Sequence, residues 1–144
     1  MTERYIDAAF SFSKKAHGHM NLTENFKVHE FACKDGSDPV FVNPLIPLIC
    51  QVVRNWFGYP YEPNSTYRTI THNKAEDGAS GSFHIYGKAV DIPARGSVTP
   101  KDLYDFLDRL FGNCMELGLY DWGVHVGVCA KKKRFTDKGY GGGK

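Results

Sequence analysis

Three side chains of this sequence, His84, Asp91 and His125, could together hold a metal ion. Two imidazole nitrogens and a carboxylate oxygen are a normal ligand set for catalytic zinc, in which water takes the fourth position. Zinc in such a site lowers the pKa of that water to about 7 and polarises a carbonyl oxygen. The spacing alone leaves a second interpretation open, in which both histidines are ordinary polar residues and Asp91 is a turn acid.

A turn must separate His84 from Asp91 if the two are to share a site. They are seven residues apart, and on an unbroken strand this spacing would place them on opposite faces. Gly87 lies between them and allows a turn or a bulge, so both could face one point. Residues 88–92 have a strand pattern, whereas residues 59–83 predict a short strand near 62–65 and then a long loop.

His125 belongs to a separate predicted strand over residues 123–129, which follows another predicted strand over residues 117–121. In the 123–129 strand, His125 shares one face with Gly123 and Gly127, which leave room for an ion and a substrate. The opposite face is apolar, and it is formed by Val124, Val126 and Val128.

Two amphipathic helices are predicted, over residues 43–58 and 99–112. The apolar stripe of the first is Leu45, Leu48, Ile49, Val52, Val53 and Trp56, and that of the second is Leu103, Phe106, Leu107, Leu110 and Phe111. Asn43 and Thr99 are suitable N-caps, and Gly58 and Gly112 suit the C-terminal ends. These elements predict an α+β fold, with helices packed on a small and mostly antiparallel sheet.

The composition is that of one compact globular domain. The chain has 144 residues, of which 42% are hydrophobic, and this excludes disorder over most of its length. No apolar run reaches the roughly 18 residues of a membrane span, so no membrane insertion is expected. The first residues resemble no signal peptide, which predicts synthesis in the cytoplasm. The four cysteines form no C-x-x-C pair and are expected to be reduced.

The chain divides into three parts. Residues 1–20 form a variable lead-in, residues 21–130 the domain, and residues 131–144 a basic, glycine-rich tail. The tail holds six Lys or Arg residues against one Asp and lacks hydrophobic periodicity, so we expect it to be mobile. Its basic run at 131–134 could attract nucleic acid or another anionic polymer, but a solvated tail is favoured and no nucleic-acid partner is expected.

An ordered set of motifs between about residues 21 and 128 carries a family resemblance. The motifs are Asn25-Phe26, Glu30-Phe31-Ala32-Cys33, Ser65-Thr66-Tyr67-Arg68, His72-Asn73, Gly78, Ser82-x-His84-x-x-Gly87-x-Ala89-x-Asp91 and Val124-His125-Val126. The set resembles the zinc D-Ala-D-Ala carboxypeptidase family of peptidoglycan peptidases, specifically its small carboxypeptidase-like and phage endolysin branch. The resemblance implies a single domain of Hedgehog/D-Ala-D-Ala-peptidase-like architecture.

By this resemblance His84, Asp91 and His125 are the Zn²⁺ ligands. Arg68 matches the arginine of the family's S-x-Y-R motif, where a guanidinium can hold a substrate carboxylate or a developing oxyanion. A purely structural salt bridge is the alternative for Arg68. Ser82 either hydrogen-bonds around the site or only shapes its loop.

The remaining site residues are assigned by position. Several family members carry an acid three residues before the last histidine, where this chain has Trp122. Asp121 precedes His125 by four residues and on a strand would share its face, which makes it the first candidate for the general base. Glu76 and Asp77 are the runners-up. Tyr86 and Trp122 could line the cleft for a peptide or sugar, or pack in the core.

Three positions depart from the family pattern, one of them the usual double glycine before the histidine motif, which is Asp77-Gly78 here. Gly127 stands where the family usually has the acid of an H-x-D motif, which removes a carboxylate that could support the last ligand. Thr66 replaces the glycine of the usual S-G-Y-R motif.

The predicted function is hydrolysis of peptide bonds in bacterial peptidoglycan, by a D-Ala-D-Ala carboxypeptidase or an endolysin-type endopeptidase. The expected partner is a peptidoglycan stem peptide, and the expected state is a monomer. The resemblance also implies action on the cell wall after phage-induced release from the cytoplasm. The alternative is a non-catalytic, zinc-stabilised binding module on the same fold.

Overall fold

The computed structural model describes residues 7–141, so the parts of the predicted lead-in and tail at 1–6 and 142–144 lie outside the described residues. The elements in chain order are β1 (Phe10–Ser13), α2 (Lys14–His17), η1 (Val28–Phe31), β2 (Pro39–Val42), α3 (Leu45–Phe57), α4 (Ile70–Ala75), η2 (Phe83–Tyr86), β3 (Ala89–Pro93), α5 (Pro100–Phe111), β4 (Glu116–Tyr120), β5 (Gly123–Gly127) and β6 (Lys133–Thr136).

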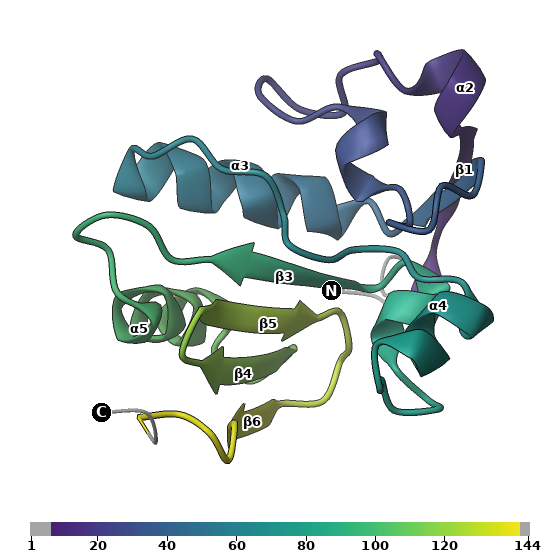
Figure 1. The fold of residues 1–144 in the computed structure, drawn as a ribbon. Helices are drawn as coiled ribbons and strands as arrows, with labels where there is room; N and C mark the ends of the chain where they lie inside the picture. The colour runs from purple at the N-terminus through teal and green to yellow at the C-terminus, as the bar shows by residue number, and fades with distance from the viewer. Residues whose placement is uncertain (1–6, 142–144) are drawn as a thin grey trace.

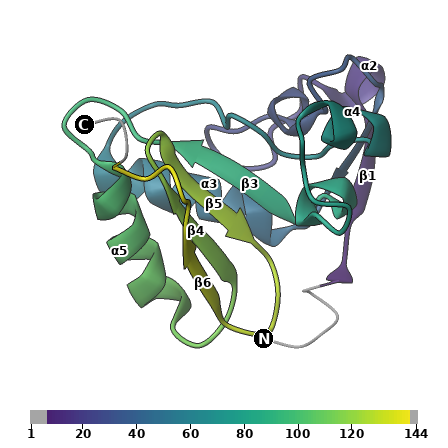
Figure 2. The same cartoon turned by 60° about the horizontal axis from the view of Figure 1, so that its bottom comes forward.

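The main sheet has four strands in the order β3-β5-β4-β6 (Figures 1 and 2). β5 runs antiparallel to both β3 and β4, whereas β6 runs parallel to β4. A separate antiparallel pair joins β1 to β2, so residues 10–13 of the predicted lead-in are part of a sheet. The fold is therefore α+β with a mostly antiparallel sheet, as predicted.

Both predicted helices are present, and their ends have the expected local causes. The side chain of Asn43 accepts a hydrogen bond from the Leu45 N–H at the start of α3, and Gly58 ends that helix in the left-handed conformation at φ 73°. At the start of α5, Thr99 and Asp102 form a reciprocal capping box.

One apolar core joins these helices to the sheet. α3 packs against β3, and α5 packs against β4 and β5. The core contains Ile46, Ile49 and Val53 from α3, Leu103 and Leu107 from α5, and Val90, Ile92, Leu117, Val124 and Val126 from the strands. Because side chains alternate along a strand, the residues between these positions point to the other face of the sheet. That face carries Asp91 and His125.

The segment at 59–83 differs from the prediction. Residues 62–65 form no strand, and only an isolated bridge joins Ser65 to Asp91. The predicted long loop contains α4, which has six residues and only one of them buried. An amphipathic period cannot be detected over so short a helix, which explains why the sequence pattern missed it.

The prediction of a mobile tail after residue 130 is wrong for β6. Its residues 133–136 pair with β4, and the side chain of Arg134 reaches α5 on the helix-covered face. Arg134 donates hydrogen bonds to the Asp108 carboxylate at 2.6 Å and to the Met115 carbonyl at 2.7 Å. The sequence shows no apolar alternation here because the inward-facing position is filled by an arginine with polar partners.

The remaining expectations concern membrane spans and cysteine pairing. No helix within residues 7–141 is long and apolar enough to cross a membrane. Cys33, Cys50, Cys114 and Cys129 form no disulfide within the described residues.

We expect Arg134→Ala to lower the free energy of unfolding by about 1–2 kcal/mol, because it removes charge-assisted hydrogen bonds between β6 and α5. Chemical denaturation followed by circular dichroism would measure this change. Lys132→Ala, at an exposed position of the same basic run, serves as the control and should leave stability unchanged. Equal stability of the two variants would mean that β6 does not pack on the domain.

Candidate metal centre

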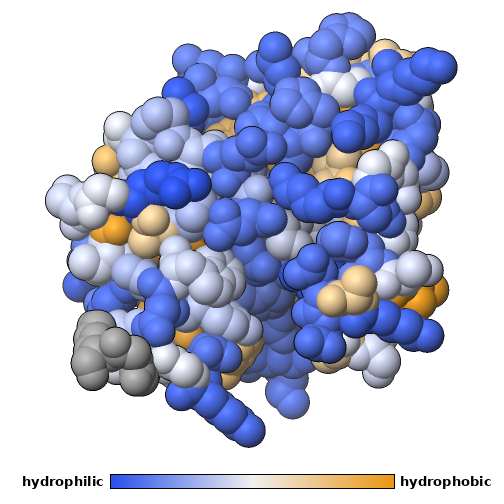
Figure 3. Space-filling view, in the orientation of Figure 1, coloured by the Kyte–Doolittle hydropathy of each residue, from blue (hydrophilic) through white to orange (hydrophobic). Residues whose placement is uncertain are grey.

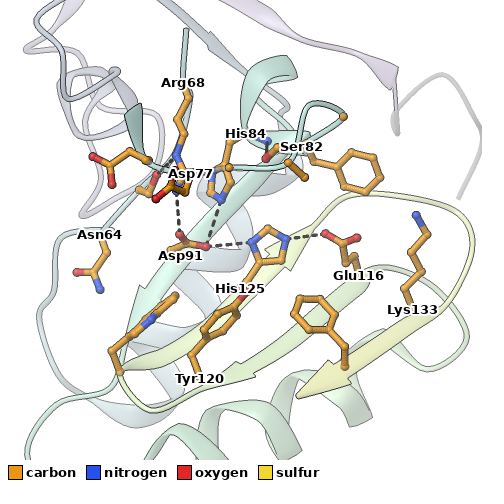
Figure 4. A pocket seen from close by; sticks show the side chains of 18 residues that line it. Asn64, Arg68, Asp77, Ser82, His84, Asp91, Glu116, Tyr120, His125 and Lys133 are labelled. Atoms are coloured by element: carbon orange, nitrogen blue, oxygen red, sulfur yellow. Dashed lines mark hydrogen bonds and ion pairs between the residues drawn. The ribbon is translucent and has the colours of Figure 1, made fainter. Parts of the chain in front are cut away.

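The side chains of His84, Asp91 and His125 converge on one point (Figure 4). Oδ1 of Asp91 lies 3.2 Å from Nε2 of His84 and 3.0 Å from Nδ1 of His125. The three potential ligand atoms all lie within 4.8 Å of one another. His84 is 3% exposed and Asp91 8% exposed, so a charged carboxylate is enclosed here with two imidazoles.

Strand register brings Asp91 to His125. The two residues are direct partners in the antiparallel β3–β5 pair, and both point away from the core. The backbone of Asp91 is also held from its other side, because its N–H donates to the Ser65 carbonyl and its carbonyl accepts from the Asn64 N–H. Asp91 is therefore fixed by neighbouring backbone on both sides.

A turn at Gly87 brings His84 to the same point, as predicted. His84 lies in the short 3-10 helix η2, and Gly87 ends that helix in the left-handed conformation at φ 67°. A Cβ atom at Gly87 would lie 2.2 Å from the Phe41 carbonyl oxygen. Both the backbone conformation and the lack of space therefore require glycine at this position.

The hydrogen bonds on the outer nitrogens favour one tautomer of each ring. Nδ1 of His84 lies 2.7 Å from the Thr66 carbonyl oxygen, which can only accept, so this nitrogen carries the proton. Nε2 of His125 lies 2.6 Å from the Glu116 carboxylate and donates to it in the same way. The inner nitrogen of each ring, Nε2 of His84 and Nδ1 of His125, faces the Asp91 oxygen and is the atom that would bind a cation. Three electron-pair donors directed at one point fit a divalent cation such as Zn²⁺.

Without a cation, protons must compensate for this concentration of negative charge. Burial of His125 would lower its pKa, but hydrogen bonds to Asp91 and Glu116 outweigh burial and raise the pKa to about 9. Burial likewise acts to raise the pKa of Asp91, yet its contacts with the two imidazoles hold that pKa well below its ordinary value. The cluster thus favours an anionic Asp91 next to positive charge.

Glu116 is the site residue that the sequence did not reveal. It lies on β4, and Gly127 of β5 is its partner in the strand register. A Cβ atom at Gly127 would lie 2.8 Å from the Glu116 carboxylate and 2.6 Å from the Phe83 ring. The glycine that replaces the H-x-D acid therefore leaves room for an acid from the adjacent strand. Alternation could place Glu116 on the site face, but only the register brings it to His125.

Arg68 makes the structural ion pair that was the alternative to a substrate-binding role. Its guanidinium lies 3.6 Å from Oδ2 of Asp91, while its Nε donates to the Ser65 hydroxyl at 2.9 Å. Nη1 donates to the Asn73 side-chain oxygen at 3.3 Å. Arg68 also lines the cleft above the cluster. It is therefore a structural ion-pair partner of Asp91 whose position remains open to a ligand.

The cluster lies at the base of a cleft with a volume of about 680 Å³. Residues 64–68 and 76–84 contribute to one side, and the face of β4, β5 and β6 contributes to the other. Lys133 and Phe135 of β6 belong to this lining, so the predicted tail supplies part of the cleft. In Figure 3 the molecule is hollowed between the sheet and the α4 side, and hydrophilic side chains line the hollow.

The predicted substrate-binding residues fall into two groups. Ser82 and Trp122 line the cleft, as does Arg68. The Ser82 hydroxyl accepts from the His84 N–H and so caps η2, while Trp122 stacks on Tyr120 with ring centroids 4.8 Å apart. Tyr86 does not line the cleft and is 57% exposed. A 3-10 helix has three residues per turn, so Tyr86 and His84 point in different directions.

The structure does not bring Asp121 to the cluster. The alternation argument required one continuous strand, but Asp121 and Trp122 form the turn between β4 and β5. The Asp121 carboxylate accepts a hydrogen bond from the Gly141 N–H at 2.7 Å and borders a separate hollow. The runners-up Glu76 and Asp77 both line the cleft.

We expect Glu116→Ala to weaken Zn²⁺ binding about 10–100-fold, because His125 then loses the acceptor that orients its ring. Glu116→Gln keeps an acceptor oxygen and should lose less. Competition with a chromophoric chelator measures both affinities. Glu62→Ala, which removes an exposed carboxylate paired with Lys34, is the control. Unchanged affinity in Glu116→Ala would show that His125 needs no support from β4.

Comparison with known proteins agrees with this geometry. A family model described as Peptidase M15 matches residues 24–128, a range that includes all three candidate ligands. No curated protein and no solved structure gives a match. The family match covers well over half of the chain and coincides with the domain that carries the converging His84, Asp91 and His125. The chain therefore belongs to the Peptidase M15 family, the zinc D-Ala-D-Ala carboxypeptidase family that its motifs resemble.

Proposed function

We propose that this protein is a zinc-dependent peptidase that hydrolyses peptide bonds in peptidoglycan stem peptides. The observation that carries the proposal is the convergence of His84, Asp91 and His125 at the base of an open, hydrophilic cleft. A catalytic zinc site needs three protein ligands and an open fourth position, and a cluster facing a cleft supplies both. The family match supports the same reaction class.

The three ligands would hold Zn²⁺ through Nε2 of His84, Oδ1 of Asp91 and Nδ1 of His125. When bound, zinc supplies Lewis acidity, which activates a water molecule and polarises the carbonyl of the peptide bond. Thr66 and Glu116 orient the two imidazoles through their outer nitrogens. These contacts keep the ligand atoms in place before substrate arrives.

Arg68 positions the substrate in this proposal. Its guanidinium is held by Ser65, Asn73 and Asp91, so little side-chain freedom is lost when a substrate binds. A guanidinium fixed at the cleft is suited to a substrate carboxylate or to the oxyanion that develops during hydrolysis. A peptide with a free carboxylate near the cleaved bond matches the first of these roles.

Asp77 is our candidate for the general base. It lines the cleft. Within the described residues 7–141, its carboxylate has no hydrogen-bond or ion-pair partner. Its neighbour Glu76 also lines the cleft. The Glu76 carboxylate, however, lies 3.6 Å from Nε2 of His72, so it already has a protein partner. A carboxylate that faces the cleft without a protein partner can accept the proton of the attacking water and return it to the leaving amine.

Zinc-loaded protein should release peptide products from purified muropeptides, and mass spectrometry of the digest would identify the cleaved bond. His84→Ala removes one ligand and should abolish cleavage, whereas His29→Ala, at an exposed histidine outside the cleft, should not. Chelation should stop the reaction and added Zn²⁺ should restore it. Intact muropeptides with the zinc-loaded wild-type protein would contradict the proposal, and a zinc-stabilised binding module would then be the better description.

Asp77→Asn should lower kcat about 10²–10⁴-fold, because an amide cannot accept the proton. Zn²⁺ affinity and KM should change little, and asparagine tolerates the left-handed backbone of Asp77 at φ 55°. Steady-state kinetics on the cleaved muropeptide measures the effect. Asp121→Asn is the matched control and should keep wild-type kcat. The reverse pattern, with loss only in Asp121→Asn, would assign the base to Asp121.

A further inference from the structure

A second group of metal-ligating side chains lies outside the cleft. Cys33, Asp35 and His72 each offer one ligand atom, and these atoms lie within 4.8 Å of one another. None of the three lines the cleft that holds the first cluster. Cys33 and Asp35 follow η1, while His72 lies on α4, so the group joins two segments that are far apart in the sequence.

The donor types in this group favour zinc over other common cations. Thiolate sulfur and imidazole nitrogen are preferred ligands of Zn²⁺, whereas Mg²⁺ and Ca²⁺ prefer sites made only of oxygen. Glu76 follows His72 by four residues, and its carboxylate lies 3.6 Å from Nε2 of His72. The Glu76 oxygen is not one of the atoms grouped within 4.8 Å, so this exposed side chain would have to rotate toward Cys33 and Asp35 to complete a four-coordinate site.

Hydrogen bonds already orient the potential ligand atoms. The Asp35 carboxylate accepts from the Ser37 N–H at 2.9 Å and from the Thr69 hydroxyl at 2.8 Å. The Thr69 N–H points to the Cys33 sulfur at 3.5 Å. Such bonds to the ligands are the outer support that protein metal sites use. Thr69 therefore contacts two of the three groups, and its side chain also caps α4.

A metal ion bound by Cys33, Asp35 and His72 would have a structural role. α4 has six residues, well below the length at which a helix is stable by itself in water. Asn73 on α4 accepts from Arg68 and donates to the Ala79 carbonyl, so this helix supports both the guanidinium and the 76–82 wall of the cleft. A metal bound by His72 would fasten α4 to the segment that follows η1.

We propose that Cys33, Asp35 and His72 bind a second Zn²⁺ ion, with Glu76 as the fourth ligand. This ion is structural and holds the α4 side of the cleft against the residues after η1. The site goes beyond the peptidase reaction, because it uses none of the three ligands of the first cluster.

Cobalt substitution tests this site independently of activity. Co²⁺ bound to a thiolate gives a near-ultraviolet charge-transfer band, and the His84–Asp91–His125 cluster contains no sulfur. We expect the band in the wild-type protein and in His84→Ala, and its loss in Cys33→Ser. Cys114→Ser, which changes a partly buried thiol that contacts the Phe111 carbonyl, should keep the band.

Metal content provides the second measurement. The wild-type protein should bind two equivalents of Zn²⁺, and both His84→Ala and Cys33→Ser should bind one. His72→Gln, at a less buried position, repeats the test if Cys33→Ser fails to fold, and it should also bind one equivalent. A single equivalent in the wild-type protein without a charge-transfer band would overturn the proposal, as would a band that persists in both Cys33→Ser and His72→Gln. Neither result would affect the peptidase proposal, which His84→Ala tests separately.

Discussion

The antiparallel register between β3 and β5 is the constraint on which the site depends. It places Asp91 directly opposite His125, on the face of the sheet away from the helices. A slip of one residue would send His125 into the apolar core and turn Val124 or Val126 toward the cleft. The buried valines therefore oppose any such slip, and the apolar core that stabilises the fold also fixes the relative position of two metal ligands. The two faces of the sheet thus have different roles. The helix-covered face buries apolar side chains, and the other face carries Asp91, His125 and Glu116.

Negative charge and lone pairs gathered in one place explain the contacts around the cluster. Two imidazoles direct their free nitrogens at the Asp91 carboxylate, and this arrangement is stable only with a cation or with added protons. Thr66 and Glu116 determine which nitrogen of each ring is free, so the outer contacts matter as much as the ligands. Glu116 also accounts for Gly127: the acid expected two residues after His125 is absent, and a carboxylate from the neighbouring strand contacts the ring instead.

The opposite side of the cleft is built from irregular chain rather than from sheet. Backbone hydrogen bonds join Ser65 to β3 and Arg68 to η2, and α4 supports Arg68 through Asn73. Polar contacts hold this wall, among them the hydrogen bonds that Arg68 donates to Ser65 and Asn73. On the sheet side, β6 adds Lys133 and Phe135, while its Arg134 points to α5.

Local sequence patterns predicted the parts of this protein that depend on local chemistry. Apolar spacing and capping residues identified α3 and α5, Gly87 indicated the turn that joins His84 to Asp91, and alternation assigned His125 to the face opposite Val124 and Val126. Features that depend on pairing between distant segments became visible only in the folded chain. Glu116 reaches His125 only through the β4–β5 register. Asp121 lies in the turn of the hairpin rather than beside the cluster, because the chain turns where a continuous strand was assumed. The tail residues 133–136 join the sheet for the same kind of reason, since a strand that fills its inward position with Arg134 shows no apolar pattern. Alternation is a property of one strand and can be read locally, whereas register and strand order arise from contacts between strands that the sequence does not display.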